Sequence, residues 1–275
     1  MKLTFWGVRA EIPTPGTDYV AYGGNTCCVT VEGDDDSQII LDAGTGIINL
    51  AKTLLGGPCG KGQGRLEILL SHTHWDRIQG IPYFIPAFIP GNQLTFWGPH
   101  TNKQGLYELL DYQMHKEYNP IFALENIGST IRTHDLASHQ EFDGWRIDAQ
   151  MVPQRTIVSV SYRIERDGAT IVILGNVPES LDLTPGVVEF CRGADLLLHD
   201  SAACDPSEGP DENVEGHAVQ HAITLARVAQ IPKVALTYYR PHRTDESLDR
   251  FLTEATAGVD DVEVISGREG LKIEV

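Results

Sequence analysis

Two histidines and an aspartate lie close together in one short polar segment, where they could bind a metal ion. The segment reads Ser71-His72-Thr73-His74-Trp75-Asp76-Arg77 and follows the apolar run 66–70. Such a run predicts a buried strand, and the end of a strand presents the next side chains from a fixed position. Imidazole and carboxylate groups are common metal ligands. The spacing therefore makes His72, His74 and Asp76 candidate metal ligands.

Structural roles for these histidines are weighed beside the metal site. A pair of histidines is more often structural than metal-binding, so His72 and His74 are either former ligands now held by hydrogen bonds or part of a surviving single-metal site. His199 and Asp200 end another apolar run. For that pair we favour a structural role in orienting the floor of the site.

Composition narrows the class of protein. The chain has 275 residues and a formal net charge of −17, which disfavours nucleic acid as a partner. It has neither an apolar run long enough for a membrane span nor a signal-peptide pattern, so we expect a cytoplasmic protein without membrane contact. Five cysteines without Cys-x-x-Cys spacing favour reduced, buried thiols over disulfides or a zinc ribbon.

Hydrophobic patterning predicts strands first and then alternating strands and helices. This order is typical of layered sheets covered by helices, and the absence of a linker or repeat favours one domain over 1–275. The turn Asp167-Gly168 predicts a hairpin. The predicted strands are 3–8, 27–31, 38–41, 66–70, 151–164, 170–174, 196–199 and 234–237, and the predicted helices are 47–55, 217–229 and 246–255.

The histidine segment resembles the His-x-His-x-Asp-His signature of the metallo-β-lactamase superfamily. Further motifs in fixed order resemble a bacterial subfamily related to phosphodiesterases and RNase Z, and together they cover nearly the whole chain. These motifs are 7–9, 13–16, 22–26, 41–46, 81–84, 194–200, 216–218 and 244–246.

The resemblance implies a four-layer αβ/βα sandwich of the α/β class. It also implies two zinc, iron or manganese ions whose bridging water attacks an ester, thioester, amide or phosphodiester. His217 lies where related nucleases and phosphodiesterases carry a loop thought to assist at the substrate phosphate. As the first residue of a predicted helix it could equally be a cap.

Four positions depart from the ligand pattern that the resemblance implies. Arg77 stands in place of the last histidine of the signature, and Arg155 in place of a histidine that begins a later strand. Asn176 replaces the carboxylate that bridges the two metals, and an amide cannot replace an anion between dications without a large electrostatic loss. Tyr238-Tyr239-Arg240-Pro241 replaces a His-His-Asp-Pro-like stretch. The metal site is therefore predicted to be degenerate.

Two hypotheses explain why Arg77 and Arg155 stand at expected ligand positions. Both side chains stay charged at neutral pH. In the first, they substitute for metal charge and pair with Asp76, and also with Asp42 and Asp200. In the second, they form an anion pocket with nearby histidines, including His242, for a phosphate or carboxylate. The candidate ligand-binding residues are Arg77, Arg155, Asn176, His217 and Tyr239.

The leading prediction is a non-catalytic pseudo-hydrolase that binds an anionic small molecule or a protein partner and is compatible with a homodimer. It needs no cofactor. The alternative is a metal-dependent hydrolase of phosphodiesters or other esters, with one zinc, iron or manganese ion on His72, His74 and Asp76. Asp76 and His217 are the catalytic candidates. Metal-free catalysis, with the arginines stabilising an oxyanion and a histidine acting as base, is a third option.

Overall fold

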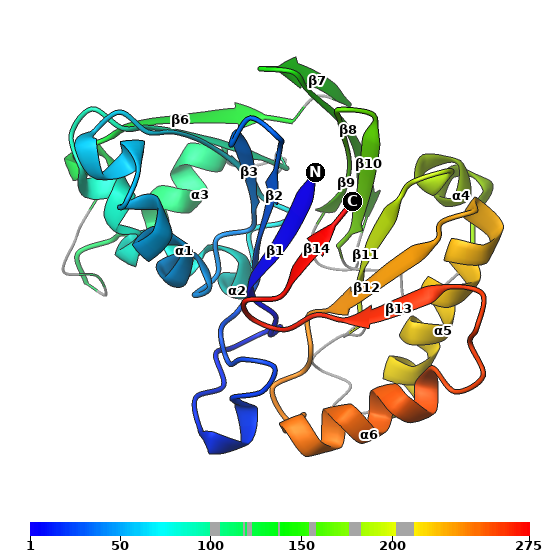
Figure 1. The fold of residues 1–275 in the computed structure, drawn as a ribbon. Helices are drawn as coiled ribbons and strands as arrows, with labels where there is room; N and C mark the ends of the chain where they lie inside the picture. Colours follow the sequence, from blue (N-terminus) through cyan, green and yellow to red (C-terminus); the bar gives the residue numbers. More distant parts are fainter. Residues whose placement is uncertain are drawn as a thin grey trace.

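The fold consists of two β-sheets with helices on their outer faces, as shown by a computed structural model (Figure 1). The structure describes residues 1–99, 105–117, 119, 123–136, 138–153, 158–175, 183–201 and 212–275. Arg155 and Asn176, two of the predicted ligand-binding residues, lie outside these ranges, as does Cys204.

Each sheet has seven strands within the described residues. The first contains β1 (Lys2–Gly7), β2 (Cys28–Glu32), β3 (Gln38–Leu41), β4 (Arg65–Leu69), β5 (Gln93–Gly98), β6 (Thr130–Asp135) and β14 (Lys272–Glu274). The second contains β7 (His139–Phe142), β8 (Trp145–Pro153), β9 (Val158–Arg166), β10 (Ala169–Leu174), β11 (Leu196–Asp200), β12 (Lys233–Thr237) and β13 (Glu263–Ser266). Their orders are β14-β1-β2-β3-β4-β5-β6 and β13-β12-β11-β10-β9-β8-β7.

The helices complete four layers. They are α1 (Ile47–Leu54), α2 (Trp75–Ile78), α3 (Leu106–Tyr112), α4 (Pro185–Cys191), α5 (Glu212–Ala229) and α6 (Asp245–Ala255), with short 3-10 turns at Thr17–Tyr19, Pro58–Lys61, Ile81–Tyr83, Ile85–Phe88 and Leu124–Asn126. One apolar core packs α1 and α3 on the outer face of the first sheet. A larger core fills the space between the sheets and continues to α5. This arrangement confirms the predicted αβ/βα sandwich.

Several predicted elements agree with the structure and others do not. The predictions for β3, β4 and α1 are correct to within one residue, and Asp167 and Gly168 have the positive φ values, 52° and 80°, of a tight hairpin between β9 and β10. The single strand predicted at 151–164 is wrong. That range contains the end of β8 and most of β9, which pair antiparallel, with Pro153 opposite Val158.

Two further expectations can be compared with the described residues. Cys27, Cys28, Cys59 and Cys191 are free and buried, as predicted. No helix in the described part of the chain combines the length and apolar character that crossing a membrane requires.

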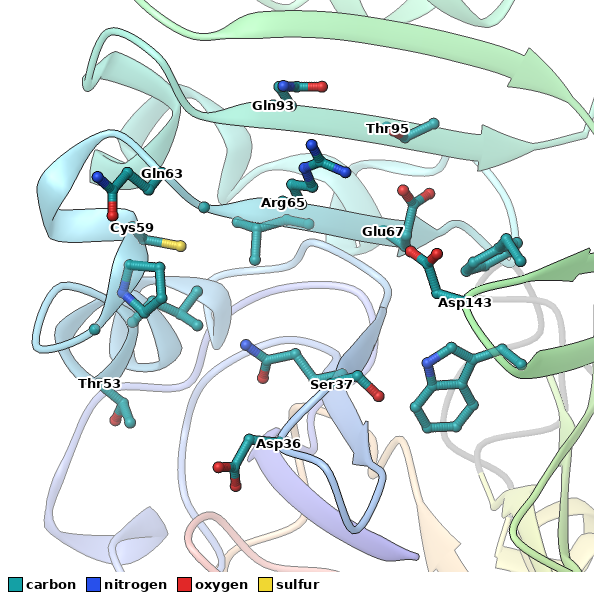
Figure 2. A pocket seen from close by; sticks show the side chains of 18 of the residues that line it. Asp36, Ser37, Thr53, Cys59, Gln63, Arg65, Glu67, Gln93, Thr95 and Asp143 are labelled. Atoms are coloured by element: carbon teal, nitrogen blue, oxygen red, sulfur yellow. The ribbon is translucent and has the colours of Figure 1, made fainter.

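The parallel strands have two functionally different ends. β3, β4, β5 and β6 run parallel in the first sheet, and β10, β11, β12 and β13 run parallel in the second. The signature segment follows the carboxyl end of β4. A cavity of about 550 Å³ lies at the amino ends of β3, β4 and β5 (Figure 2). The two ends therefore hold separate candidate sites.

Candidate functional site

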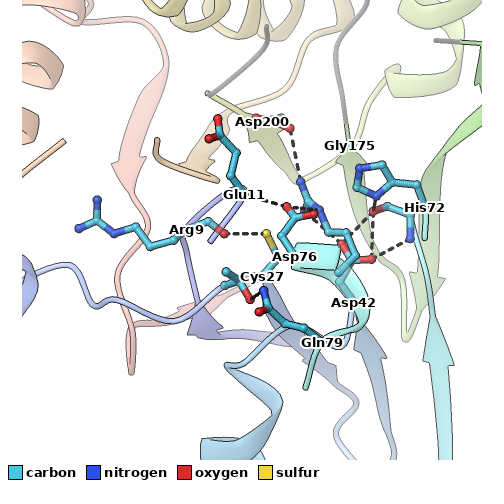
Figure 3. A network of polar contacts seen from close by, with 12 residues as sticks. Arg9, Glu11, Cys27, Asp42, His72, Asp76, Gln79, Gly175 and Asp200 are labelled. Carbon is cyan, nitrogen blue, oxygen red and sulfur yellow. Dashed lines mark hydrogen bonds and ion pairs between the residues drawn. The ribbon is translucent and has the colours of Figure 1, made fainter. Parts of the chain in front are cut away.

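The signature segment folds into a turn and the short helix α2, which points Arg77 into the space between the sheets. Three aspartates meet its guanidinium there: Asp42 directly after β3, Asp76 on α2 and Asp200 at the end of β11. Because these elements belong to both sheets, only the complete sandwich assembles this cluster. We call Arg77, Asp42, Asp76, Asp200 and Tyr238 the arginine cluster, whose three aspartates are labelled in Figure 3.

Arg77 makes ion pairs with all three aspartates. Its Nη1 lies 3.2 Å from Asp42 Oδ2, its Nε 3.2 Å from Asp76 Oδ2, and its Nη2 3.7 Å from Asp200 Oδ2. The side chain is only 2% exposed. Burial opposes the charged form, but the neighbouring acidic groups outweigh it and raise the pKa of Arg77 well above its ordinary value. Arg77 is therefore a permanent internal cation.

An aromatic ring covers the same guanidinium. The Arg77 Cζ lies 4.0 Å from the centre of the Tyr238 ring, and Tyr238 is 1% exposed. A buried cation over an aromatic face is favourable because the ring carries negative charge on its face. Tyr238 has a left-handed φ of 64° and Asp42 one of 58°. Such strained backbone is held in place by its surroundings and often marks a functional site.

Serine and aspartate connect the cluster to the first signature histidine. The Ser71 amide and hydroxyl both donate to Asp42, at 2.8 and 3.0 Å from Oδ1. The His72 Nδ1 lies 3.2 Å from the same hydroxyl. Burial, helped by Arg77 and His74, lowers the pKa of His72 well below its ordinary value, so its ring is neutral. This supports the interpretation of His72 as a residue held by hydrogen bonds.

The signature residues do not form a metal-binding group. The rings of His72 and His74 lie 4.8 Å apart between centres, but the His74 side chain is exposed at the start of α2 and Asp76 is paired with Arg77. Within the described residues, no three His, Cys, Asp or Glu side chains are placed to hold one metal ion. A guanidinium also occupies the space among the aspartates. The described residues therefore do not fit a two-metal centre.

Two other predicted residues lie away from the arginine cluster. Tyr239 donates its hydroxyl to the Leu236 carbonyl at 2.8 Å, and its ring packs edge-on against Tyr22. His217 is exposed on α5, which begins at Glu212, so it lies inside the helix and is not a cap. Neither placement supports a role at Arg77.

His242, one of the histidines of the hypothetical anion pocket, faces a buried carboxylate together with two arginines. The Arg243 Nε donates to Glu215 Oε2 at 2.8 Å, while Arg240 and His242 approach Glu215 Oε1 at 3.7 and 3.5 Å. Because Glu215 is 3% exposed, this is a second internal charge cluster. Both arginines therefore already have a carboxylate partner within the protein.

Sequence reasoning did not identify Tyr238 or Glu11. The Glu11 amide donates to Asp76 Oδ2 at 3.2 Å, and its backbone has a left-handed φ of 64°. Burial raises the pKa of the Glu11 carboxyl, an effect that Arg240 opposes and Asp76 reinforces. The position of Tyr238 in a stretch that replaces ligand histidines was a usable indication, whereas no local pattern indicated Glu11.

Comparisons with known proteins agree with the fold and the motifs. A model of the beta-lactamase superfamily domain matches residues 37–238. The chain is 27% identical over 224 residues to ribonuclease Z of Thermoplasma acidophilum, covering 66% of this chain and 71% of that protein. It is 28% identical over 248 residues to ribonuclease Z of Saccharolobus solfataricus, covering 76% and 81%.

Solved structures show the same fold at low sequence identity. The metallo-β-lactamase fold protein YhfI from Bacillus subtilis has a TM-score of 0.68 at 19% identity, covering 100% of this chain and 99% of that one. Human tRNase Z, short form, has a TM-score of 0.64 at 20% identity, with the same coverage. The sequence relatives are named as enzymes that act on RNA. They support the hydrolase alternative better than the non-catalytic prediction, and they run weakly against the expectation of no nucleic-acid partner. The family-model match, the sequence relatives and the fold together show that the chain belongs to the metallo-β-lactamase superfamily and is related to RNase Z and phosphodiesterases.

Proposed function

We propose that this protein uses a hydrolase fold for binding and does not carry out two-metal hydrolysis. The observation that supports this proposal is the buried Arg77 guanidinium, ion-paired with Asp42, Asp76 and Asp200. A metal dication entering there would face a fixed positive charge a few ångströms away in a medium that screens poorly. It would also have to break buried ion pairs of Arg77, and breaking a buried ion pair is strongly destabilising.

The second candidate is a metal-dependent hydrolase of phosphodiesters or other esters, and its support comes from the ribonuclease relatives. In this candidate, His72 and His74 would hold one zinc, iron or manganese ion, and Asp76 would turn from Arg77 to join them. A bound ion would lower the pKa of a water molecule. The residues themselves would supply only neutral imidazoles and one carboxylate, so the candidate requires a rearrangement of α2.

Metal content and turnover distinguish the two candidates. Protein purified without chelator, and the same protein incubated with zinc, manganese or iron(II), is analysed by elemental mass spectrometry and assayed with bis-p-nitrophenyl phosphate. We expect far less than one ion per chain and no metal-dependent turnover. Near-stoichiometric metal, with turnover abolished by His74→Ala, would contradict the proposal and establish the hydrolase. A control at an exposed histidine on β7, His139→Ala, should leave any such turnover unchanged.

A variant designed to gain metal binding tests whether Arg77 is what excludes the metal. Arg77→His removes the guanidinium and supplies an imidazole at the position where the family signature has one. If Arg77 is what excludes metal, this variant should bind zinc measurably more than the wild-type protein. Equal zinc binding by both folded proteins would show that Arg77 does not control the site.

A further inference from the structure

The cavity at the amino ends of β3, β4 and β5 is lined by residues of both charges and by aromatic rings. Its volume of about 550 Å³ is within the range of small-molecule sites. The residues at its strand-lined wall, Arg65, Glu67, Gln93 and Thr95, lie on one face of β4 and β5 and point the same way (Figure 2). The arginine cluster follows the opposite ends of these strands, so the cavity can act independently of it.

The first part of the cavity is positive. Arg65 on β4 lies opposite Gln93 in the strand register, and Arg132 on β6 donates from Nη1 to Gln93 Oε1 at 3.0 Å. Within the described residues, neither arginine has a carboxylate within 4.0 Å, although other arginines such as Arg163 and Arg227 are ion-paired. Two exposed guanidiniums available for an oxyanion are notable in a protein with a net charge of −17.

The second part of the cavity is negative. Glu67 and Asp143 lie beside each other in Figure 2, on β4 and on the turn between β7 and β8. Glu67 Oε2 accepts a 2.6 Å hydrogen bond from the Trp97 indole, which fixes the carboxylate. Burial raises the pKa of Glu67, and the charge of Asp143 raises it further. A cationic group of a ligand would stabilise these carboxylates.

Aromatic side chains form an apolar wall next to the negative part. Phe142 stacks parallel to Trp97, with an interplanar angle of 4° and centroids 5.8 Å apart. Trp145 also lines the cavity, and the Arg166 guanidinium lies 4.6 Å from the centre of its ring. The Arg166 Nη1 donates to the Asp143 carbonyl at 2.6 Å and so holds the turn that carries Asp143 and the aromatic residues. The wall is therefore built before any ligand arrives.

From this layout we infer that the cavity binds a small zwitterion, an α-amino acid with an apolar or aromatic side chain. Its carboxylate would lie between Arg65 and Arg132, because guanidiniums bind carboxylates through paired hydrogen bonds. Its ammonium group would lie at Glu67 and Asp143, and its side chain would contact Phe142. A nucleotide fits less well, since its several negative charges would approach those carboxylates. This inference goes beyond the proposed function and does not depend on whether the chain hydrolyses anything.

Isothermal titration of the full chain with L-phenylalanine and two analogues tests the inference. N-acetyl-L-phenylalanine lacks the ammonium group, and 2-phenylethylamine lacks the carboxylate. Since each charged group makes charge-assisted hydrogen bonds, we expect L-phenylalanine to bind about tenfold tighter than either analogue. Absence of binding by L-phenylalanine, or equal binding by all three compounds, would overturn the inference.

Two substitutions test which residues bind the carboxylate of the ligand and which bind its ammonium group. Arg65→Gln should weaken L-phenylalanine about tenfold and leave 2-phenylethylamine unchanged. Glu67→Gln keeps an acceptor for the Trp97 indole, and it should weaken L-phenylalanine while leaving N-acetyl-L-phenylalanine unchanged. Arg268→Gln, an exposed arginine between β13 and β14, is the matched control and should have no effect. Wild-type affinity for L-phenylalanine in the two cavity variants would refute the site, whatever the metal experiments show.

Discussion

Arg77 makes ion pairs with three buried carboxylates, so its removal deletes all three pairs. We expect Arg77→Met, which keeps much of the side-chain volume, to lower the free energy of unfolding by about 3–5 kcal/mol, the range for breaking a buried ion pair. Arg77→Lys keeps the charge but not the fork of donors, so its loss should be smaller. Urea denaturation followed by far-UV circular dichroism measures both. Equal stability of Arg77→Met and wild type would show that the ion pairs contribute nothing.

The same variant has a predictable pH dependence through Asp42. Burial raises the pKa of Asp42, while Arg77 and Ser71 oppose the rise, so it should rise further in Arg77→Met. A carboxylate with a higher pKa in the folded state binds more protons there, and stability then falls as pH rises between the unfolded and folded pKa values. The stability difference between Arg77→Met and wild type should therefore be smaller at about pH 5 than at about pH 8. A difference independent of pH would contradict this account.

His199 should make the protein sensitive to acid. Its Nδ1 donates to the Asp200 carbonyl at 2.8 Å, and its Nε2 accepts from His221 at 2.9 Å. Burial, and then His221, lowers the pKa of His199 to about 3. Its lowered folded pKa gives stability that is present above the unfolded pKa of about 6.5 and is lost toward the folded pKa as pH falls, by about 1.4 kcal/mol per pH unit. His199→Gln should reduce this slope in urea denaturation. His217→Gln, at an exposed histidine, should leave it unchanged, and an unaltered slope in both variants would exclude His199.

At the scale of secondary-structure elements, Arg9 connects the loop after β1 to the start of α6. This arginine is fully buried, donates to the Gly23 and Arg243 carbonyls at 2.7 Å each, and lies 3.6 Å from Asp245 Oδ1. Through these contacts the motif at 7–9 lies against the motif at 244–246. They meet in space although they are far apart in sequence.

Substitution of Arg9 tests this tether. A lysine ammonium cannot reach both carbonyls, so Arg9→Lys should lower the free energy of unfolding by about 2–3 kcal/mol and accelerate amide hydrogen exchange in α6. Arg227→Lys is the control, because Arg227 makes a two-bond pair with Asp261 in an exposed position and should tolerate lysine. If exchange in α6 is the same in Arg9→Lys as in the control, the tether is not what holds the helix.

At the scale of the whole molecule, the two sheets share one core and should unfold together. Tyr162 of the second sheet donates to the Leu70 carbonyl beyond β4 of the first sheet at 2.7 Å, and the core between the sheets contains residues of both. We expect tryptophan fluorescence and far-UV circular dichroism to give coincident urea transitions, as for a single domain over 1–275. Tyr162→Phe should shift both midpoints together, at a cost of about 1 kcal/mol. Two separated transitions would mean that the sheets are independent units.

Local patterns in the sequence were sufficient to predict part of the fold. Alternating or continuous apolar runs located β3, β4 and α1, and ordered motifs implied the sandwich. They did not separate β8 from β9, and they started α5 at His217 when it begins at Glu212. A run of apolar residues indicates burial but not where the chain reverses, so the boundary between β8 and β9 became visible only in the strand pairing.

The sequence by itself, through its resemblance to the metallo-β-lactamase superfamily, predicted the superfamily and predicted that Arg77 stands where the signature has a histidine. Only the tertiary structure decided which groups neutralise that cation. Asp42 lies 35 residues away in sequence, and of two adjacent buried tyrosines it is Tyr238, with a φ of 64°, whose ring covers Arg77. Short-range spacing cannot encode such a choice, because it depends on how two sheets pack and on which strand ends they bring together.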